Sequence, residues 1–322
     1  MIKKIKSILI ITILIYISIM ILTDSKTIMN TVLFSINLWI NNIFPSLFPF
    51  FILSEFLINY GFVELLAELT KSIMTKLFKV NPNCSFVLIM SLLSGFPASA
   101  KYTRELYQNG ILDKKEASKI LTFTHFSNPL FILGTVSIFL NNKNAALLIL
   151  IIHYISNIII GLLFRNFYPY KNKNNRISFK KAIDDMNNKR IDHSLNFGTL
   201  ISKSVMNTIN TLLLILGTVT TFLIISTIIT NAFDINEYLN GILKGILEMT
   251  QGIQSISYLN IPIQNKSTII AMILSFGGIS VHMQIKSILS DTDIEYHPFL
   301  VARLLHASIS GILIYSLYNI IM

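Results

Sequence analysis

Long apolar runs alternate with short polar segments along most of the chain, and this pattern predicts an all-α membrane protein. A helix needs about 20 apolar residues to cross a bilayer. Runs of about this length occupy residues 5–22, 31–58, 120–140, 145–164, 211–230 and 299–321. Lys3, Lys4 and Lys6 stand at the start of the first run and no small-residue cleavage site follows it, so we expect an uncleaved helix that begins in the cytoplasm.

Composition agrees with this pattern. Of the 322 residues, 52% are apolar and 13% are charged, whereas a typical soluble domain has about 25% charged residues. The formal charge of +10 indicates basic cytoplasmic loops rather than affinity for nucleic acid, because lysine and arginine accumulate on that side of membrane proteins. The single cysteine, Cys84, excludes an intramolecular disulfide and a multi-cysteine metal site, and we expect a packed thiol.

Two segments, 84–108 and 268–290, contain apolar runs too short to cross a bilayer and then helix-breaking residues. The breakers, which free the backbone or remove an N–H donor, are Gly95, Pro97, Gly277 and Gly278. Non-helical backbone at membrane depth is tolerated only where protein buries it or where it lines a wet cavity. We interpret both segments as re-entrant hairpins whose half-helix ends form a ligand site, the alternative being a buried turn without a ligand. Further prolines that kink or gate apolar segments are Pro45, Pro49 and Pro129.

A basic stretch divides the chain into two halves. Residues 165–193 carry eight basic and three acidic side chains, which places this stretch in the cytoplasm. The predicted parts are an anchor helix (1–27), a first gate-like repeat with an extra span (28–166), a linker (167–193) and a second gate-like repeat (194–322). Helical periodicity with a charged face predicts an interfacial helix over 62–80 and an amphipathic helix over 235–256. A mixed helix is expected at 195–208, before the span that follows it.

The two halves share one order of segments, which is a span, an amphipathic helix, a broken short helix, a charged loop and a span with polar residues. Residues 61–119 carry a net charge of +3, and residues 232–300 carry −3. Opposite charges place equivalent loops on opposite sides of the membrane. The sequence therefore predicts an inverted repeat with two opposed broken hairpins, a transporter architecture with its site near the midplane.

Several motifs resemble known families. Phe44–Ile52, Ser94–Pro97 and Ser127–Ile132 are similar to the first nucleoside-recognition, or gate, domain. Leu274–Gln284 and Phe299–Ala307 are similar to the C-terminal half of the YlbJ family of sporulation integral membrane proteins, also called stage V sporulation protein V. The resemblance covers nearly the whole chain. It implies a spore-forming bacterium and a role in moving dipicolinic acid from the mother cell across the outer forespore membrane.

Dipicolinate is a flat aromatic dianion, so its site needs positive potential, donors for two carboxylates and an apolar wall. Arg303 is the first candidate, because a guanidinium inside a span is costly and its fork matches a carboxylate; the alternative is an arginine that reaches the headgroups. His282 and His306 are candidates to donate to a carboxylate or carry a proton, or are structural. Lys101 either guards the entrance or extends to the interface.

Half-helix ends and neutral donors complete the predicted substrate site. They are Gly277, Gly278, Ser280, Ser94, Gly95, Ser99, Ser127 and Asn128. Glu248 is expected to position a helix or to pair with a base rather than to contact an anion.

An enzyme is the competing class. The sequence contains no His-Glu-x-x-His pair, no nucleophile elbow, no Walker loop and no pair of intramembrane aspartates, so we expect no catalysis, cofactor or metal. We expect a secondary transporter or channel for dipicolinic acid in the bacterial cytoplasmic membrane or outer forespore membrane. The alternatives are a transporter of nucleosides or other small anions, and a non-transporting scaffold of a sporulation complex. Expected partners are an anionic substrate and the lipid bilayer, with a second copy of the chain or other sporulation membrane proteins as further candidates.

Overall fold

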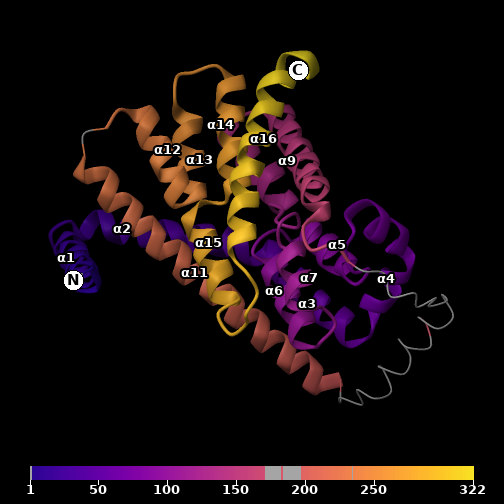
Figure 1. Ribbon diagram of the computed structural model, residues 1–322. Coiled ribbons are helices and arrows are strands. Elements are labelled where there is room, and N and C mark those ends of the chain that lie inside the picture. The colour runs from indigo at the N-terminus through magenta and orange to yellow at the C-terminus, as the bar shows by residue number, and fades with distance from the viewer. Residues whose placement is uncertain (1, 171–182, 184–196, 234) are drawn as a thin grey trace.

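The computed structural model describes residues 2–170, 183, 197–233 and 235–322, without the side chains of residues 2–6 and 9. Within these ranges every regular element is helical (Figure 1), which confirms the all-α prediction. Helical segments long and apolar enough to cross a membrane are Ser25–Asn59, Lys143–Asn166, Phe197–Ala232, Ile263–Ile288 and His297–Ile321. The prediction of a polytopic membrane protein is therefore confirmed. Most of the predicted linker, 167–193, lies outside the described residues.

The chain begins with a series of helices that includes two π-helical turns. These elements are α1 (Ile2–Thr23), α2 (Ser25–Leu38), η1 (Trp39–Ile43), α3 (Phe44–Asn59), α4 (Phe62–Ser72) and η2 (Ile73–Phe78). Pro45 lies two residues after the end of the π-helical turn η1, inside the continuous helical segment Ser25–Asn59. Pro49 lies inside α3, six residues after the end of the same π-helical turn. The predicted kinked segment is therefore a helix that widens near its centre.

Two half-length helices, α5 (Cys84–Ser94) and α6 (Ala98–Gln108), form the first hairpin. The ring centroids of Phe86 and Tyr102 lie 5.8 Å apart, although 16 residues of straight helix span about 24 Å. The chain must therefore reverse direction between them, as the sequence predicts. Each arm is about 16 Å long, roughly half the thickness of the hydrocarbon core.

The span predicted over 120–140, with its interruption at Ser127-Asn128-Pro129, is not a single helix. The chain forms α7 (Lys114–Ile120), an irregular stretch over 121–128, η3 (Phe131–Val136) and α8 (Ser137–Leu140) before α9 (Lys143–Leu163) and η4 (Phe164–Asn166). Pro129 has no N–H and restricts the residue before it, so a helix cannot continue through this point. The irregular stretch lies along α9, where Asn157 Nδ2 donates to the His125 carbonyl at 2.6 Å.

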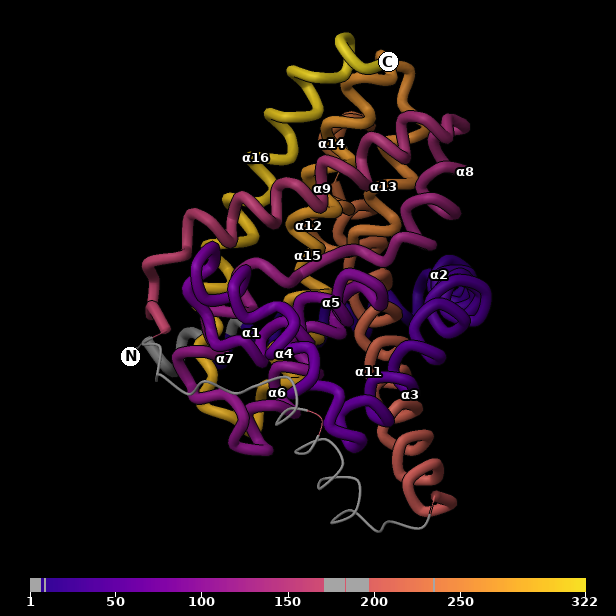
Figure 2. Tube along the Cα trace, turned by 90° about the vertical axis from the view of Figure 1, so that its right-hand side faces the viewer, coloured from indigo at the N-terminus to yellow at the C-terminus, as the bar shows by residue number. Residues whose placement is uncertain are grey.

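The second half opens with one helix of 36 residues, α11 (Phe197–Ala232), rather than the predicted mixed helix and separate span. It runs antiparallel to α2, η1 and α3. Ser35 Oγ lies 2.7 Å from Thr220 Oγ1, and Trp39 Nε1 donates to the Leu212 carbonyl at 2.9 Å. In Figure 2 these helices form one flank of the molecule.

The predicted single amphipathic helix over 235–256 is a second hairpin. Its arms are α12 (Glu237–Leu247) and α13 (Met249–Tyr258), separated by the extended residue Glu248. The arms approach closely because glycines face each other, and a Cβ added to Gly252 would lie 2.1 Å from the Gly245 Cα. Neither glycine nor proline occupies the turn itself, so no helix breaker marks it in the sequence.

The predicted re-entrant hairpin over 268–290 is instead a broken helix that continues in one direction. It consists of α14 (Ile263–Phe276) and α15 (Gly278–Ile288), followed by α16 (His297–Ile321). Successive residues of the broken helix contact α16 and its N-cap residue in antiparallel order. Gln264 contacts Tyr315, Ser275 contacts Ser310 and His282 contacts Tyr296. A reversal at Gly277 would interrupt this order.

The two halves therefore repeat one arrangement of long helix, hairpin, broken segment and closing helix. The equivalent parts are α2–α3 with α11, α5–α6 with α12–α13, residues 114–140 with 263–288, and α9 with α16. In each repeat the long helix, the broken segment and the closing helix cross the molecule. Because three crossings leave the chain on the opposite side, the second repeat has the opposite orientation to the first. Figure 1 shows the hairpins approaching from opposite ends. The end at which α9 stops and α11 begins is called the linker side below.

The charge argument for this orientation is wrong, because the acidic loop of the second half lies against the basic segment of the first. Arg104 Nε donates to Asp291 Oδ1 at 2.8 Å, and Lys114 Nζ lies 3.5 Å from a Glu295 oxygen. These hydrogen bonds from Arg104 lower the pKa of Asp291 to about 2. The opposite charges pair across the repeats on the linker side.

Candidate functional site

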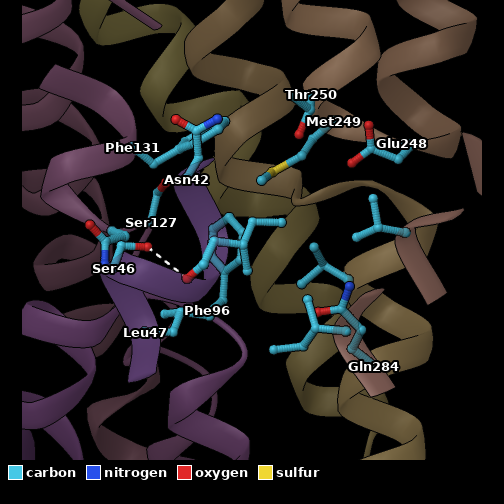
Figure 3. Close-up of a pocket in the computed structure, with 15 residues that line it drawn as sticks. Asn42, Ser46, Leu47, Phe96, Ser127, Phe131, Glu248, Met249, Thr250 and Gln284 are labelled. Carbon is cyan, nitrogen blue, oxygen red and sulfur yellow. Dashed lines mark hydrogen bonds between the residues drawn. The ribbon is translucent and has the colours of Figure 1, made fainter. Parts of the chain in front are cut away.

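A cavity of about 50 Å³ lies where the two repeats meet. Both hairpin tips, the first helix break, the helix after the second break and both long helices contribute to it (Figure 3). The first repeat supplies Asn42, Ile43, Ser46, Leu47, Phe96, Ser127, Asn128 and Phe131. The second repeat supplies Ile215, Val219, Glu248, Met249, Thr250, Val281 and Gln284. Neither repeat encloses this cavity alone.

The first hairpin tip is fastened to the first helix break. Gly95 has a φ of +81°, and a Cβ at this position would lie 2.4 Å from the Asn128 backbone nitrogen. Asn128 Nδ2 donates to the Ser94 carbonyl at 2.8 Å, which satisfies the exposed end of α5. Its Oδ1 accepts from the Leu130 N–H at 2.7 Å, which starts the next helix. The predicted residues Gly95 and Asn128 thus hold tip and break together.

The second tip meets the second break in the same way. A Cβ added to Gly278, whose φ is +71°, would lie 3.0 Å from the Met249 backbone nitrogen. One added to the neighbouring Gly277, whose φ is +90°, would lie 3.2 Å from the His125 Nε2 of the first repeat. The predicted glycines therefore allow close contacts beside the cavity without lining it.

The cavity presents neutral donors and acceptors. Ser127 Oγ is buried and has no hydrogen-bond partner within the described residues, so it is free for a ligand. Ser46 Oγ donates to the Ile43 carbonyl at 3.0 Å, the bond drawn in Figure 3. Helices α6, α13 and α15 begin beside the cavity, and helix N-termini carry partial positive charge. Thr250 and Gln284 add a hydroxyl and an amide on the second repeat's side.

Arg303 lies outside the cavity lining, fully buried on α16. Its guanidinium donates to the Thr122 carbonyl, to the His125 carbonyl at 3.3 Å and to Asn157 Oδ1 at 3.1 Å. Unwound backbone at membrane depth must find its hydrogen bonds within the protein. Arg303 supplies them to the irregular stretch of the first repeat.

Hydrogen bonds fix the proton positions of three buried histidines. His306 Nε2 donates to the His153 carbonyl at 2.9 Å, so its Nδ1 accepts from Arg303 at 2.8 Å. His282 Nε2 donates to the Phe276 carbonyl at 3.1 Å and its Nδ1 accepts from the Tyr296 hydroxyl at 2.6 Å. His153 Nε2 accepts from the Ser127 N–H at 2.9 Å. None of the three lines the cavity, and each connects helices as a neutral ring.

Lys101 lies in a buried charge cluster on the linker side. Its Nζ is 2.9 Å from Glu55 Oε1 and 3.7 Å from Glu105 Oε1. Beside this cluster is a polar vestibule of about 570 Å³, to which Arg104 and Lys203 contribute. On α11 the vestibule ends at Leu214 and the central cavity begins at the next residue. The two spaces are therefore neighbours.

The remaining predicted serines do not line the cavity. Ser94 Oγ is 2.9 Å from the Tyr102 hydroxyl, while the buried Ser99 and Ser280 hydroxyls have no partner among the described residues. The sequence reasoning missed several lining residues, namely Asn42, Ser46, Phe96, Met249, Thr250 and Gln284, and missed that Glu248 lines the cavity. Within the described residues, no group of three histidine, cysteine or carboxylate side chains is arranged to hold a metal ion.

Two comparisons with known proteins agree with this geometry. Residues 40–164 match the family described as Gate, nucleoside recognition. The chain is 31% identical over 309 residues to the sporulation integral membrane protein YlbJ of Bacillus subtilis (strain 168), and this match covers 88% of the chain and 76% of that protein. No solved structure matches the chain.

Fold, cavity and matched region define a polytopic membrane protein with a nucleoside-recognition gate domain. The chain belongs to the YlbJ family of sporulation integral membrane proteins.

Proposed function

We propose that the protein is a secondary transporter that moves dipicolinic acid, a small aromatic dicarboxylate, across the outer forespore membrane. The observation that carries the proposal is the central cavity, which opposed hairpin tips and broken helices build from both repeats. Discontinuous helices that meet at a repeat interface are typical of transporter binding sites. By the positive-inside rule, the linker side and the N-terminus face the cytoplasm.

The substrate assignment is supported by shape and by donors. Phe96 and Met249 offer apolar surface from the two tips, and Ser127 offers a free hydroxyl. Helix N-termini favour an anion at the cavity, and the vestibule lining carries three basic and two acidic side chains, a small positive excess. At about 50 Å³ the cavity is much smaller than the roughly 300 Å³ of a typical ligand site. Binding therefore requires a hairpin tip to move outward.

A second candidate substrate is a nucleoside. The lining favours it, because the described residues around the cavity include amides, hydroxyls and a carboxylate but no lysine or arginine. The matched family is also described by nucleoside recognition. Neutral hydrogen-bonding groups around an apolar wall suit an uncharged ring as well as a charged one.

Uptake into proteoliposomes tests the proposal. We expect vesicles with purified protein to take up labelled dipicolinate at least tenfold faster than empty vesicles, with no competition from uridine or phosphate. Uridine uptake without dipicolinate uptake would favour the second candidate. Uptake of neither compound by correctly folded protein would contradict a transport role.

Ser127→Ala tests the cavity as the binding site. Loss of its free hydroxyl removes one hydrogen bond to substrate, which is worth about 1 kcal/mol, so we expect a roughly fivefold rise in the KM for dipicolinate. Ser91→Ala is the matched control, because the Ser91 hydroxyl is also buried and without a partner among the described residues but lies on α5 away from the cavity. Equal effects of the two substitutions would show that the cavity is not where substrate binds.

A further inference from the structure

One charged residue lines the central cavity within the part of the chain that the structure describes. It is Glu248, the extended residue between α12 and α13 at the tip of the second hairpin. Its side chain is 1% exposed. Figure 3 shows it on the wall that also carries Met249 and Thr250. A carboxylate in this position faces whatever occupies the cavity.

The Glu248 carboxylate has no basic partner. Its Oε2 accepts from the Gln251 N–H at 2.9 Å, which caps α13. No lysine, arginine or histidine nitrogen among the described residues lies within 4.0 Å of its oxygens. Burial of an unpaired carboxylate strongly disfavours its ionised form. Burial favours the protonated form and the hydrogen bond from Gln251 favours the ionised form, so this carboxylate can both take up and release a proton.

Other titratable groups near the hairpin do not change this picture. The helices that pack against it are α8, α11, α14 and α15. Their titratable residues, together with the other titratable residues of the hairpin itself, are Lys203, Lys266, His282, Lys286, Glu237, Tyr238, Lys244 and Tyr258. None of these lines the cavity. Glu248 is thus the single group within the described lining whose charge can change at the substrate.

In so small a cavity, an anionic substrate and an ionised Glu248 repel each other. Two like charges that share a site cannot both stay ionised without a large penalty. The opposite wall carries the neutral side chains of Asn42, Ser46 and Ser127, which bring no formal positive charge. Binding of a carboxylate-bearing substrate is therefore linked to protonation of this residue.

We propose that Glu248 is the proton-binding site that couples transport to a pH gradient. One proton binds a Glu248 carboxylate oxygen before the anion enters and is released on the far side after the anion leaves. Substrate and proton then move in the same direction. This proposal rests on the proposed transport of an anion and adds the ion that drives it.

The test uses proteoliposomes with the membrane potential clamped at zero and a pH-sensitive dye enclosed. We expect the wild-type protein to accumulate dipicolinate about tenfold per pH unit for each proton that moves with it, and the dye to report proton influx with the substrate. In Glu248→Gln, exchange of labelled for unlabelled dipicolinate continues at a lower rate that no longer varies with pH. Its accumulation and its proton influx are lost.

Two further variants support the reading. Glu248→Asp keeps a carboxylate, so accumulation survives and its pH profile shifts. Glu237→Gln makes the same chemical change at an exposed site of the same hairpin and leaves accumulation within twofold of the wild type. If Glu248→Gln still accumulates dipicolinate under a pH gradient, or if a sodium gradient drives accumulation instead, the coupling proposal is overturned. Absence of any dipicolinate exchange by the wild type contradicts the proposed function itself.

Discussion

Replacement of Arg303 by methionine is expected to lower the free energy of unfolding by about 3–5 kcal/mol, because it leaves several buried acceptors without a donor and each costs about 1–3 kcal/mol. Methionine retains much of the side-chain volume but donates no hydrogen bond. The carbonyls of Thr122 and His125 and the Asn157 side-chain oxygen each lose a donor. A thermal unfolding curve of the purified protein in detergent measures the loss. We expect little correctly folded protein and at least a tenfold loss of transport.

Arg104→Met is the matched control. Arg104 also pairs with a residue far away in the sequence, Asp291, but both side chains are partly exposed. Exposed ion pairs contribute about 1 kcal/mol or less, so the melting temperature should hardly change. If Arg303→Met instead keeps the wild-type melting temperature and loses only dipicolinate binding, Arg303 contacts the substrate directly. That outcome would support the carboxylate-binding role that its sequence position suggests.

Gly252→Ala should also be strongly destabilising, although alanine normally favours a helix over glycine by about 1 kcal/mol. The added Cβ would lie 2.1 Å from the Gly245 Cα and 2.3 Å from its nitrogen. Backbone atoms cannot rotate aside, so α12 and α13 must separate. Overpacking of this kind costs about 3 kcal/mol. We expect a drop of roughly 5 °C or more in melting temperature and a tenfold or greater loss of transport, because the Glu248 tip moves with the arms.

For Gly217→Ala we expect no loss of stability, which makes it the control for Gly252→Ala. Gly217 lies in the middle of α11, and nothing lies within 4 Å of a Cβ added there. Alanine should therefore leave the melting temperature equal to or slightly above that of the wild type. Similar losses for the two substitutions would show that close packing of the second hairpin is not the cause.

The sequence is informative where composition or a helix breaker decides the structure. The apolar runs over 31–58, 145–164 and 299–321 predict membrane-spanning helices, and each falls within a helix long and apolar enough to cross a membrane. Gly95 with Pro97, and Gly277 with Gly278, mark real interruptions because their backbone geometry leaves the helical region. Two of the predicted site residues, Ser127 and Asn128, line the cavity for the same reason, since they belong to the break before Pro129.

The local sequence pattern does not predict features of the structure that long-range contacts determine. Glu248 separates two helices without glycine or proline at the turn, and the close packing of Gly245 against Gly252 is a contact between the arms that local sequence does not reveal. Loop charge misleads because Arg104 and Asp291 neutralise each other across the repeats. Arg303 looks like a ligand residue because nothing in its own helix reveals the unwound carbonyls that it serves.

The burial of Cys84 has a practical consequence. It is the only cysteine of the chain and stands fully buried at the first residue of α5. Thiol reagents attack accessible thiolates, so water-soluble maleimides find no target in the natural protein. A cysteine introduced at either hairpin tip, such as Phe96→Cys or Met249→Cys, is then the sole point of labelling. The wild-type protein therefore needs no prior removal of cysteine, and a cysteine introduced at either tip can be labelled from either face of the membrane.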